Sequence, residues 1–309
     1  MGKLLKRLFC VILILAGLTI FFMPDALTAV VDRDTEYEIT TFETSYPGED
    51  GEGEEPTEEM DALLDTIKKY NQEIYESGQA EFKDAWSYEQ PPIELSGLKG
   101  DVFGYIEVPA MGIEYPLYLG ASSSNMRKGC AVLGETSIPI GGENTNSVIA
   151  GHRGYSGIPF FRNIEALSAG DSVYITNPWG TLTYRVESIK VIDPNDVDAV
   201  KIQEGRDMVT LLTCHPYRSG GIYRYLVYCV RDDTSAEEGT EGDPEIIEHS
   251  TVTEVSNSSA ADIAFEQLIR LIGKVLIVVV LAITILSSAI RKIRRKNRPY
   301  HRGNTRSHR

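Results

Sequence analysis

The chain has 309 residues, of which 42% are hydrophobic, and a formal net charge of −15. Residues 1–31 and 270–309 hold 14 of the 30 basic side chains but only one of the 45 acidic ones, so the segment between them carries 16 basic and 44 acidic residues. Because phosphate affinity requires Lys and Arg, this balance excludes non-specific nucleic-acid binding by the middle of the chain.

Residues 1–31 are expected to form an amino-terminal membrane anchor or signal. Three basic residues precede an apolar run over Leu8–Met23, which is the order found in export signals. The run is shorter than the ~20 residues of a typical membrane span, although the stretch to Val31 extends it. Cleavage after Ala29 is an alternative, and we favour an uncleaved anchor.

The next two segments differ in composition. Residues 32–59 are acidic, rich in glycine and poor in apolar side chains, which predicts a flexible linker. Residues 60–100 are expected to hold an amphipathic helix that ends near Gly78, followed by a loop. The apolar residues at helical spacing are Leu63, Leu64, Ile67, Tyr70 and Ile74.

Residues 101–232 alternate short β-type runs with turn residues, and one short helix is expected over 159–167. This pattern predicts one all-β domain, most simply a closed or sandwich-like β-barrel. The expected strands are Phe103–Val108, Tyr115–Leu119, Ser147–Ala150, Ser172–Thr176, Leu182–Ile192, Met208–Thr213 and Tyr223–Val230.

The carboxyl-terminal part predicts a second membrane anchor. An acidic linker over 233–268 leads to an apolar stretch over 269–290, which is long enough for a transmembrane helix. The tail over 291–309 begins with a cluster of Arg and Lys, which favours the cytoplasm. We therefore expect both termini in the cytoplasm and the middle domain outside the cell membrane.

Three side chains at strand edges suggest acyl-transfer chemistry. Cys214 ends a β-type run, Arg224 opens the next one, and His152 follows the apolar segment that ends at Ala150. A thiol, an imidazole and a guanidinium supply a nucleophile, an acid–base group and an oxyanion stabiliser. The alternative is that His152 has only a structural role and that Arg153, beside it, is a surface residue. The sequence shows no metal-ligand spacing and no phosphate-binding glycine loop, so we expect no metal and no cofactor.

These residues lie in motifs that resemble the sortases, membrane-bound cysteine transpeptidases of Gram-positive bacteria. The resemblance covers about residues 70–231. It rests on Gly151-His152-Arg153-Gly154, on Thr210-Leu211-Leu212-Thr213-Cys214, on Arg224 ten residues later, and on Gly104–Pro109, Gly134–Pro139, Gly170-Asp171 and Ile192–Pro194. It implies a closed barrel of about eight strands with short helices, and His152, Cys214 and Arg224 as catalytic residues.

The resemblance also implies a substrate class. A sortase cleaves a Leu-Pro-x-Thr-Gly-like sorting signal between Thr and Gly through a thioester on the cysteine, and Thr213 is expected to contact that substrate. The two anchors resemble the class C enzymes, in which a pilin lysine accepts the acyl group and pili are polymerised. The alternative acceptor is the amine of a peptidoglycan cross-bridge. Rival hypotheses are a catalytically silent scaffold that binds pilins and a papain-like hydrolase.

A lid is the last feature that the resemblance implies. Asp84-Ala85-Trp86 is similar to the lid tripeptide of class C sortases, although Ala85 replaces the usual proline. By that resemblance Asp84 pairs with Arg224 and Trp86 covers Cys214.

If this lid exists, the double variant Asp84→Ala with Trp86→Ala will label faster with a thiol reagent, because a carboxylate and a ring no longer shield the thiol. The labelling rate of Cys214 is the measurement, and an unchanged rate would rule the lid out.

Overall fold

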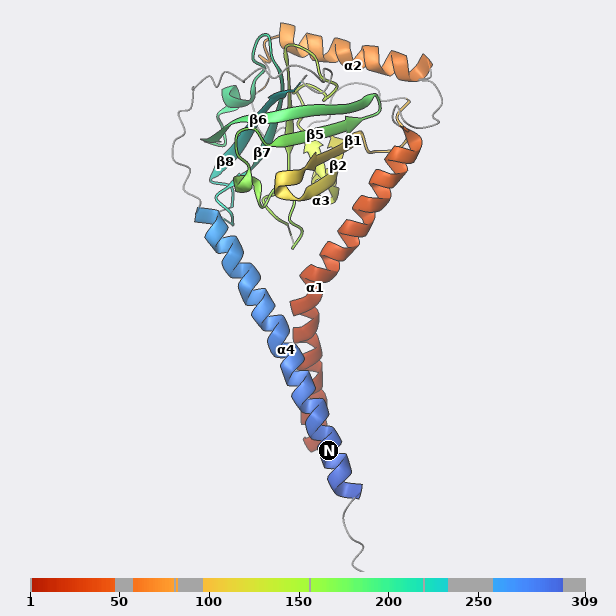
Figure 1. Ribbon diagram of the computed structural model, residues 1–309, viewed down its shortest axis with the longest axis vertical. Coiled ribbons are helices and arrows are strands. Elements are labelled where there is room, and N and C mark those ends of the chain that lie inside the picture. Colours follow the sequence, from red (N-terminus) through yellow and green to blue (C-terminus); the bar gives the residue numbers. More distant parts are fainter. Residues whose placement is uncertain are drawn as a thin grey trace, which may run out of the picture. The chain divides into compact units, whose positions relative to one another are not determined.

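The computed structural model describes residues 2–47, 58–80, 82, 97–155, 157–218, 220–232 and 258–296. Its centre is a closed barrel with the strand order β1-β2-β3-β4-β7-β8-β6-β5, in which β5 pairs back to β1 (Figure 1). The strands are β1 Gly104–Val108, β2 Ile113–Leu119, β3 Cys130–Val132, β4 Thr145–Ala150, β5 Ser172–Asn177, β6 Gly180–Ile192, β7 Asp207–His215 and β8 Tyr223–Arg231. The predicted all-β closed barrel is confirmed.

The burial of each strand follows its sequence pattern. β6 alternates apolar and polar residues over Leu182–Ile189, and several of its residues remain partly exposed. β7 carries an almost continuous apolar run and is buried along most of its length, because it lies between β4 and β8. β3 was not expected as a separate strand, since three residues are too few for a periodic signal.

Helical turns connect the strands. They are η1 Pro109–Met111, α3 Asn125–Lys128, η2 Ile164–Ala166 and η3 Val197–Val200. The helix expected over 159–167 is reduced to η2, because the residues before it form a tight turn in which the amide of Arg162 donates to the carbonyl oxygen of Pro159.

Helix α2, Glu58–Glu76, packs its apolar face on the barrel. Leu63, Ile67 and Tyr70 are buried in the same apolar cluster as the barrel interior. Beside them, the Asn71 amide donates to the Ile138 carbonyl oxygen at 3.0 Å and accepts from the Ile138 amide at 2.8 Å. The helix is therefore fixed to the β3–β4 loop by an apolar face and by a pair of buried hydrogen bonds.

The first and last helices are much longer than the others. α1 spans Gly2–Ser45 and α4 spans Ser258–Lys296, and both are long and apolar enough to cross a membrane. α1 continues well into residues 32–59, which were expected to be a linker. Its last turns are held by contacts with the barrel: Phe42 is buried, and the Glu43 carboxylate accepts from the Tyr105 hydroxyl at 3.2 Å.

We expect Asn71→Ala to lower the opening free energy of the β3–β4 loop by about 2 kcal/mol, because it leaves the buried amide of Ile138 without a partner and removes one of the two donors to the Ile138 carbonyl oxygen, the other being the Ile140 amide. Hydrogen exchange of peptides over residues 133–140, measured on the full chain in detergent, reads this free energy. Gln72→Ala is the matched control, because that exposed side chain bonds to Glu76 of the same helix. An equal effect of both substitutions would contradict the assignment.

Candidate active site

Cys214 and Arg224 face each other across two antiparallel strands. In the register between β7 and β8, Cys214 is the direct partner of Arg224. Arg224 Nη1 donates to the carbonyl oxygen of Gly221 at 2.7 Å, which holds the guanidinium on the thiol side of the loop between the strands. The structure therefore brings together two of the three residues predicted from sequence.

Gly221 makes room for this pair. A Cβ atom at position 221 would lie 3.1 Å from the Cys214 sulfur and 3.0 Å from Arg224 Nη1, so both groups occupy the space that a side chain would take. The backbone φ of +82° also favours glycine here. The sequence signal for this residue was the Gly220-Gly221 pair ahead of β8, which sequence reasoning did not use.

His152 arrives at the same end of the barrel by a different route. β4 pairs in parallel with β7 up to Ala150 and Leu212, and the Gly151 amide donates to the Leu212 carbonyl oxygen at 3.1 Å. His152 and Cys214 each follow two residues after the last pair of this register, so both lie at the same end of the β4–β7 pair. Parallel pairing of β4 and β7 thus brings the histidine to the end of the barrel that holds the cysteine.

Aromatic rings fix the imidazole. The ring of His152 stacks on Tyr155, with centroids 5.0 Å apart, and meets the edge of Phe160 at 6.1 Å. The neighbouring Gly151 is sterically required, because a Cβ there would lie 2.7 Å from the ring of Phe161. Burial lowers the pKa of His152, and the charge of Arg127 lowers it further. The imidazole is therefore neutral near pH 7 and able to accept a proton.

The three cysteines with described side chains have different environments. Cys130 and Cys229 are fully buried, and desolvation raises the pKa of both thiols. Cys214 is half-buried and lies opposite Arg224. A thiol acts as a nucleophile only when ionised and accessible, so Cys214 is the candidate among these three.

The remaining predicted site residues have other outcomes. Thr213 is fully buried and its hydroxyl donates to the Gly151 carbonyl oxygen at 2.6 Å, so its contact here joins β7 to the end of β4. Contact of Thr213 with substrate stays a prediction. Asp84 and Trp86 lie outside the described residues. Within the described residues, no group of three His, Cys, Asp or Glu could hold a metal ion.

Sequence reasoning missed the layer of side chains behind these residues. Arg153, for which a surface position was one alternative, is 6% exposed and forms an ion pair with the buried carboxylate of Glu165. The sequence carried no signal for this pairing, because the two residues lie on a bend and a short 3₁₀ turn with no periodic pattern.

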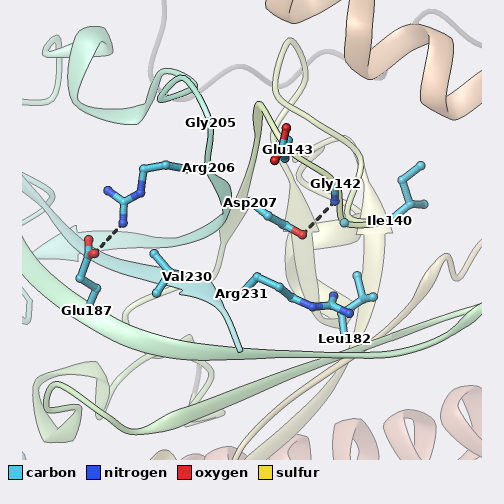
Figure 2. Close-up of a pocket in the computed structure, with 11 residues that line it drawn as sticks. Ile140, Gly142, Glu143, Leu182, Glu187, Gly205, Arg206, Asp207, Val230 and Arg231 are labelled. Carbon is cyan, nitrogen blue, oxygen red and sulfur yellow. Dashed lines mark hydrogen bonds and ion pairs between the residues drawn. The ribbon is translucent and has the colours of Figure 1, made fainter. Parts of the chain in front are cut away.

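A surface hollow of about 630 Å³ lies at the other end of β7, where Asp207 begins the strand (Figure 2). The carboxylate of Asp207 accepts from the Gly142 amide at 2.8 Å and from the Tyr184 hydroxyl at 2.9 Å. These two donors already satisfy the Asp207 carboxylate. We therefore assign the residues beside the hollow a structural role, in which they connect β7 to β6 and to the loop before β4.

Comparison with known proteins gives one consistent family. The sortase domain model matches residues 106–232. Sortase A of Staphylococcus aureus is 30% identical over 154 residues, which are 49% of this chain and 71% of that protein. Sortase D of Bacillus subtilis is 27% identical over 184 residues, 54% of this chain and 86% of that protein.

Solved structures agree with the sequence matches. Sortase C from Clostridium perfringens SM101 is 35% identical with a TM-score of 0.52, and the match covers 64% of this chain and 99% of that one. Sortase C1 of GBS Pilus Island 1 is 29% identical with a TM-score of 0.55, covering 68% and 96%. Both similar structures are class C sortases.

We expect His152 to titrate below the ordinary histidine pKa of 6.5, because burial disfavours its charged form. NMR of histidine-labelled full chain in detergent measures the midpoint, with His152→Gln to assign the signal. Arg127→Gln will raise this midpoint, since it removes a neighbouring positive charge, whereas the adjacent Lys128→Gln will not. A midpoint at or above 6.5 would contradict the burial argument.

Proposed function

This chain belongs to the sortase family of cysteine transpeptidases, and from that premise we propose that Cys214 is the nucleophile that takes up the acyl group. The observation that carries the proposal is the pairing of Cys214 with Arg224 across β7 and β8, with His152 at the end of the strand parallel to β7. A half-buried thiol, a fixed guanidinium and a neutral imidazole thus meet at one end of the barrel.

The first half of the reaction forms a thioester. The Cys214 thiol gives its proton to His152, and the sulfur attacks the carbonyl carbon of the substrate threonine. The carbonyl oxygen gains negative charge, which the Arg224 guanidinium stabilises. The bond from that carbon to the glycine nitrogen then breaks, and the proton on His152 passes to the departing amine.

The second half regenerates the thiol. An acceptor amine attacks the thioester carbon and loses a proton to His152. The carbon–sulfur bond breaks, and the sulfur of Cys214 recovers a proton from the imidazole. The acyl group ends in a new amide bond, so the number of amide bonds is unchanged and no cofactor is needed.

Two of the similar structures support a proposal for the substrate. One similar structure is a Clostridium perfringens sortase C with the C-terminal cell wall sorting motif, and another is a sortase from a pilus island. We infer that this chain takes a Leu-Pro-x-Thr-Gly-like signal and transfers it to a pilin lysine. The second candidate acceptor is the amine of a peptidoglycan cross-bridge.

The proposed location and lid complete this function. α1 and α4 would hold the chain in the cell membrane, with both termini inside and the barrel outside. A lid mutant of Streptococcus agalactiae sortase C1 is among the similar structures, which supports a lid at Asp84 and Trp86 in this chain.

Incubation of the full chain in detergent with a sorting peptide and candidate amines tests the proposal. We expect a cross-linked product with a lysine-bearing pilin peptide, no product from Cys214→Ala, and a loss of about 10² to 10³ in kcat from Arg224→Ala, because the oxyanion loses its donor. Mass spectrometry of the products is the measurement.

The control is Cys229→Ala, which removes a fully buried thiol of β8 and is expected to retain activity. A product formed only with the cross-bridge amine would favour wall anchoring over pilus assembly. Wild-type activity in Cys214→Ala would favour the scaffold hypothesis, and hydrolysis alone, with every amine supplied, would favour a hydrolase.

A further inference from the structure

The residue that follows each proposed catalytic residue points into one shared cluster. Successive side chains of a strand face opposite sides of the sheet, so the neighbours of Cys214 and Arg224 lie behind the site. His215 and Tyr225 are buried, and their rings lie 5.5 Å apart between centroids. Arg153, the neighbour of His152, places its guanidinium carbon 5.5 Å from the Tyr225 ring centroid.

Glu165 of η2 is the anion of this cluster. Its Oε1 lies 2.5 Å from Arg153 Nη2 and 3.4 Å from His215 Nδ1. The second contact is within ion-pair distance but lacks hydrogen-bond geometry. One carboxylate oxygen therefore joins the residue after His152 to the residue after Cys214. We call Arg153, Glu165, His215 and Tyr225 the Glu165 cluster.

Burial makes the charges in this cluster strong. The side chains of Arg153 and Glu165 are 4% and 6% exposed, so solvent screens them little. Among the described residues, Nε and Nη1 of Arg153 and Oε2 of Glu165 have no hydrogen-bond partner. A buried ion pair with unmade hydrogen bonds contributes little to folding stability by itself. We therefore look for its role in the site that it adjoins.

The electrostatics connect the cluster to the thiol. Burial lowers the pKa of Arg153, while Glu165, then Tyr225 and Cys214, oppose that shift. Burial also lowers the pKa of His215, which Glu165 opposes and Arg153 reinforces. Near pH 7 the histidine is therefore neutral, and the ion pair of Arg153 with Glu165 lies behind Cys214. On the other side of the strands, within the described residues, His152 and Arg224 are the titratable groups of the proposed site that lie at the Cys214 end of the barrel.

We propose that Glu165 is a positioning residue that acts on Cys214 through Arg153 and His215. Its carboxylate fixes the two side chains behind the site, and it balances the positive charge of Arg153 beside the thiol. This inference rests on the proposed role of Cys214. By this proposal, Glu165 of η2 has two effects. It fixes the spacing between His152 and Cys214, and it sets the local charge around the thiolate.

Opposite charges predict opposite effects. Glu165→Gln leaves Arg153 unbalanced, which favours the thiolate, so the pH midpoint of Cys214 alkylation should fall by about one unit. Arg153→Gln leaves Glu165 unbalanced, and the midpoint should rise by about the same amount. The double variant should return toward the wild-type midpoint. In each single variant, kcat for transpeptidation should fall about tenfold to a hundredfold, because the reacting groups lose their alignment.

The experiment uses the full chain in detergent and iodoacetamide, with the modified peptide identified by mass spectrometry. The matched control is the more exposed pair of Arg206 and Glu187, 2.6 Å apart beside the hollow at the start of β7 (Figure 2). Neutralising either of these residues should leave the midpoint of Cys214 alkylation unchanged.

The outcomes separate a positioning role from a structural one. Shifts in the same direction, or no shift in either variant, would overturn the proposal and leave only a structural ion pair. If a neutral variant does not fold, Arg153→Lys and Glu165→Asp serve instead. They keep the charges, so kcat should fall while the midpoint stays within about 0.3 units, and a larger shift would overturn the proposal. Alkylation needs no turnover, so these results are independent of whether Cys214→Ala abolishes transpeptidation.

Discussion

The register of β7 with its two neighbours is the constraint on which the rest of the site depends. β7 pairs in parallel with β4 and antiparallel with β8, which brings His152 and Arg224 to the end of the barrel where Cys214 lies. Because side chains alternate along a strand, a slip of one residue would turn the thiol to the opposite face. The buried apolar run of β7 resists such a slip, since it would expose the core.

The same alternation gives the site a front and a back. On the front, the thiol and the guanidinium share the space that Gly221 leaves open, and the imidazole lies at the same end of the barrel. On the back, the Glu165 cluster carries buried charge within a few residues of each front group. The segment that carries His152 is fixed by the stacking of its ring on Tyr155 and by the close approach of Gly151 to the ring of Phe161. Reactivity and rigidity therefore come from opposite faces of the same strands.

Environment distinguishes three chemically identical thiols. Cys130 and Cys229 lie inside the barrel, where desolvation keeps them protonated, and they behave as small apolar residues. Cys214 is the last residue but one of β7, half-buried beside a guanidinium. The barrel thus confines the one candidate nucleophile among them to its edge, in a domain that is acidic overall and flanked by two helices able to cross a membrane.

The sequence by itself determined the all-β barrel, the amphipathic helix before it, the apolar helices at both ends and the motif residues His152, Cys214 and Arg224. It could do so because periodicity and local motifs depend only on residues that are close together in the sequence. Tertiary structure decided what depends on distant contacts. It extended α1 past its apolar run, reduced the helix near Pro159 to one turn, and buried Arg153 against Glu165. Strand pairing is a long-range interaction, so only the closed barrel could show which side chains share the space around Cys214.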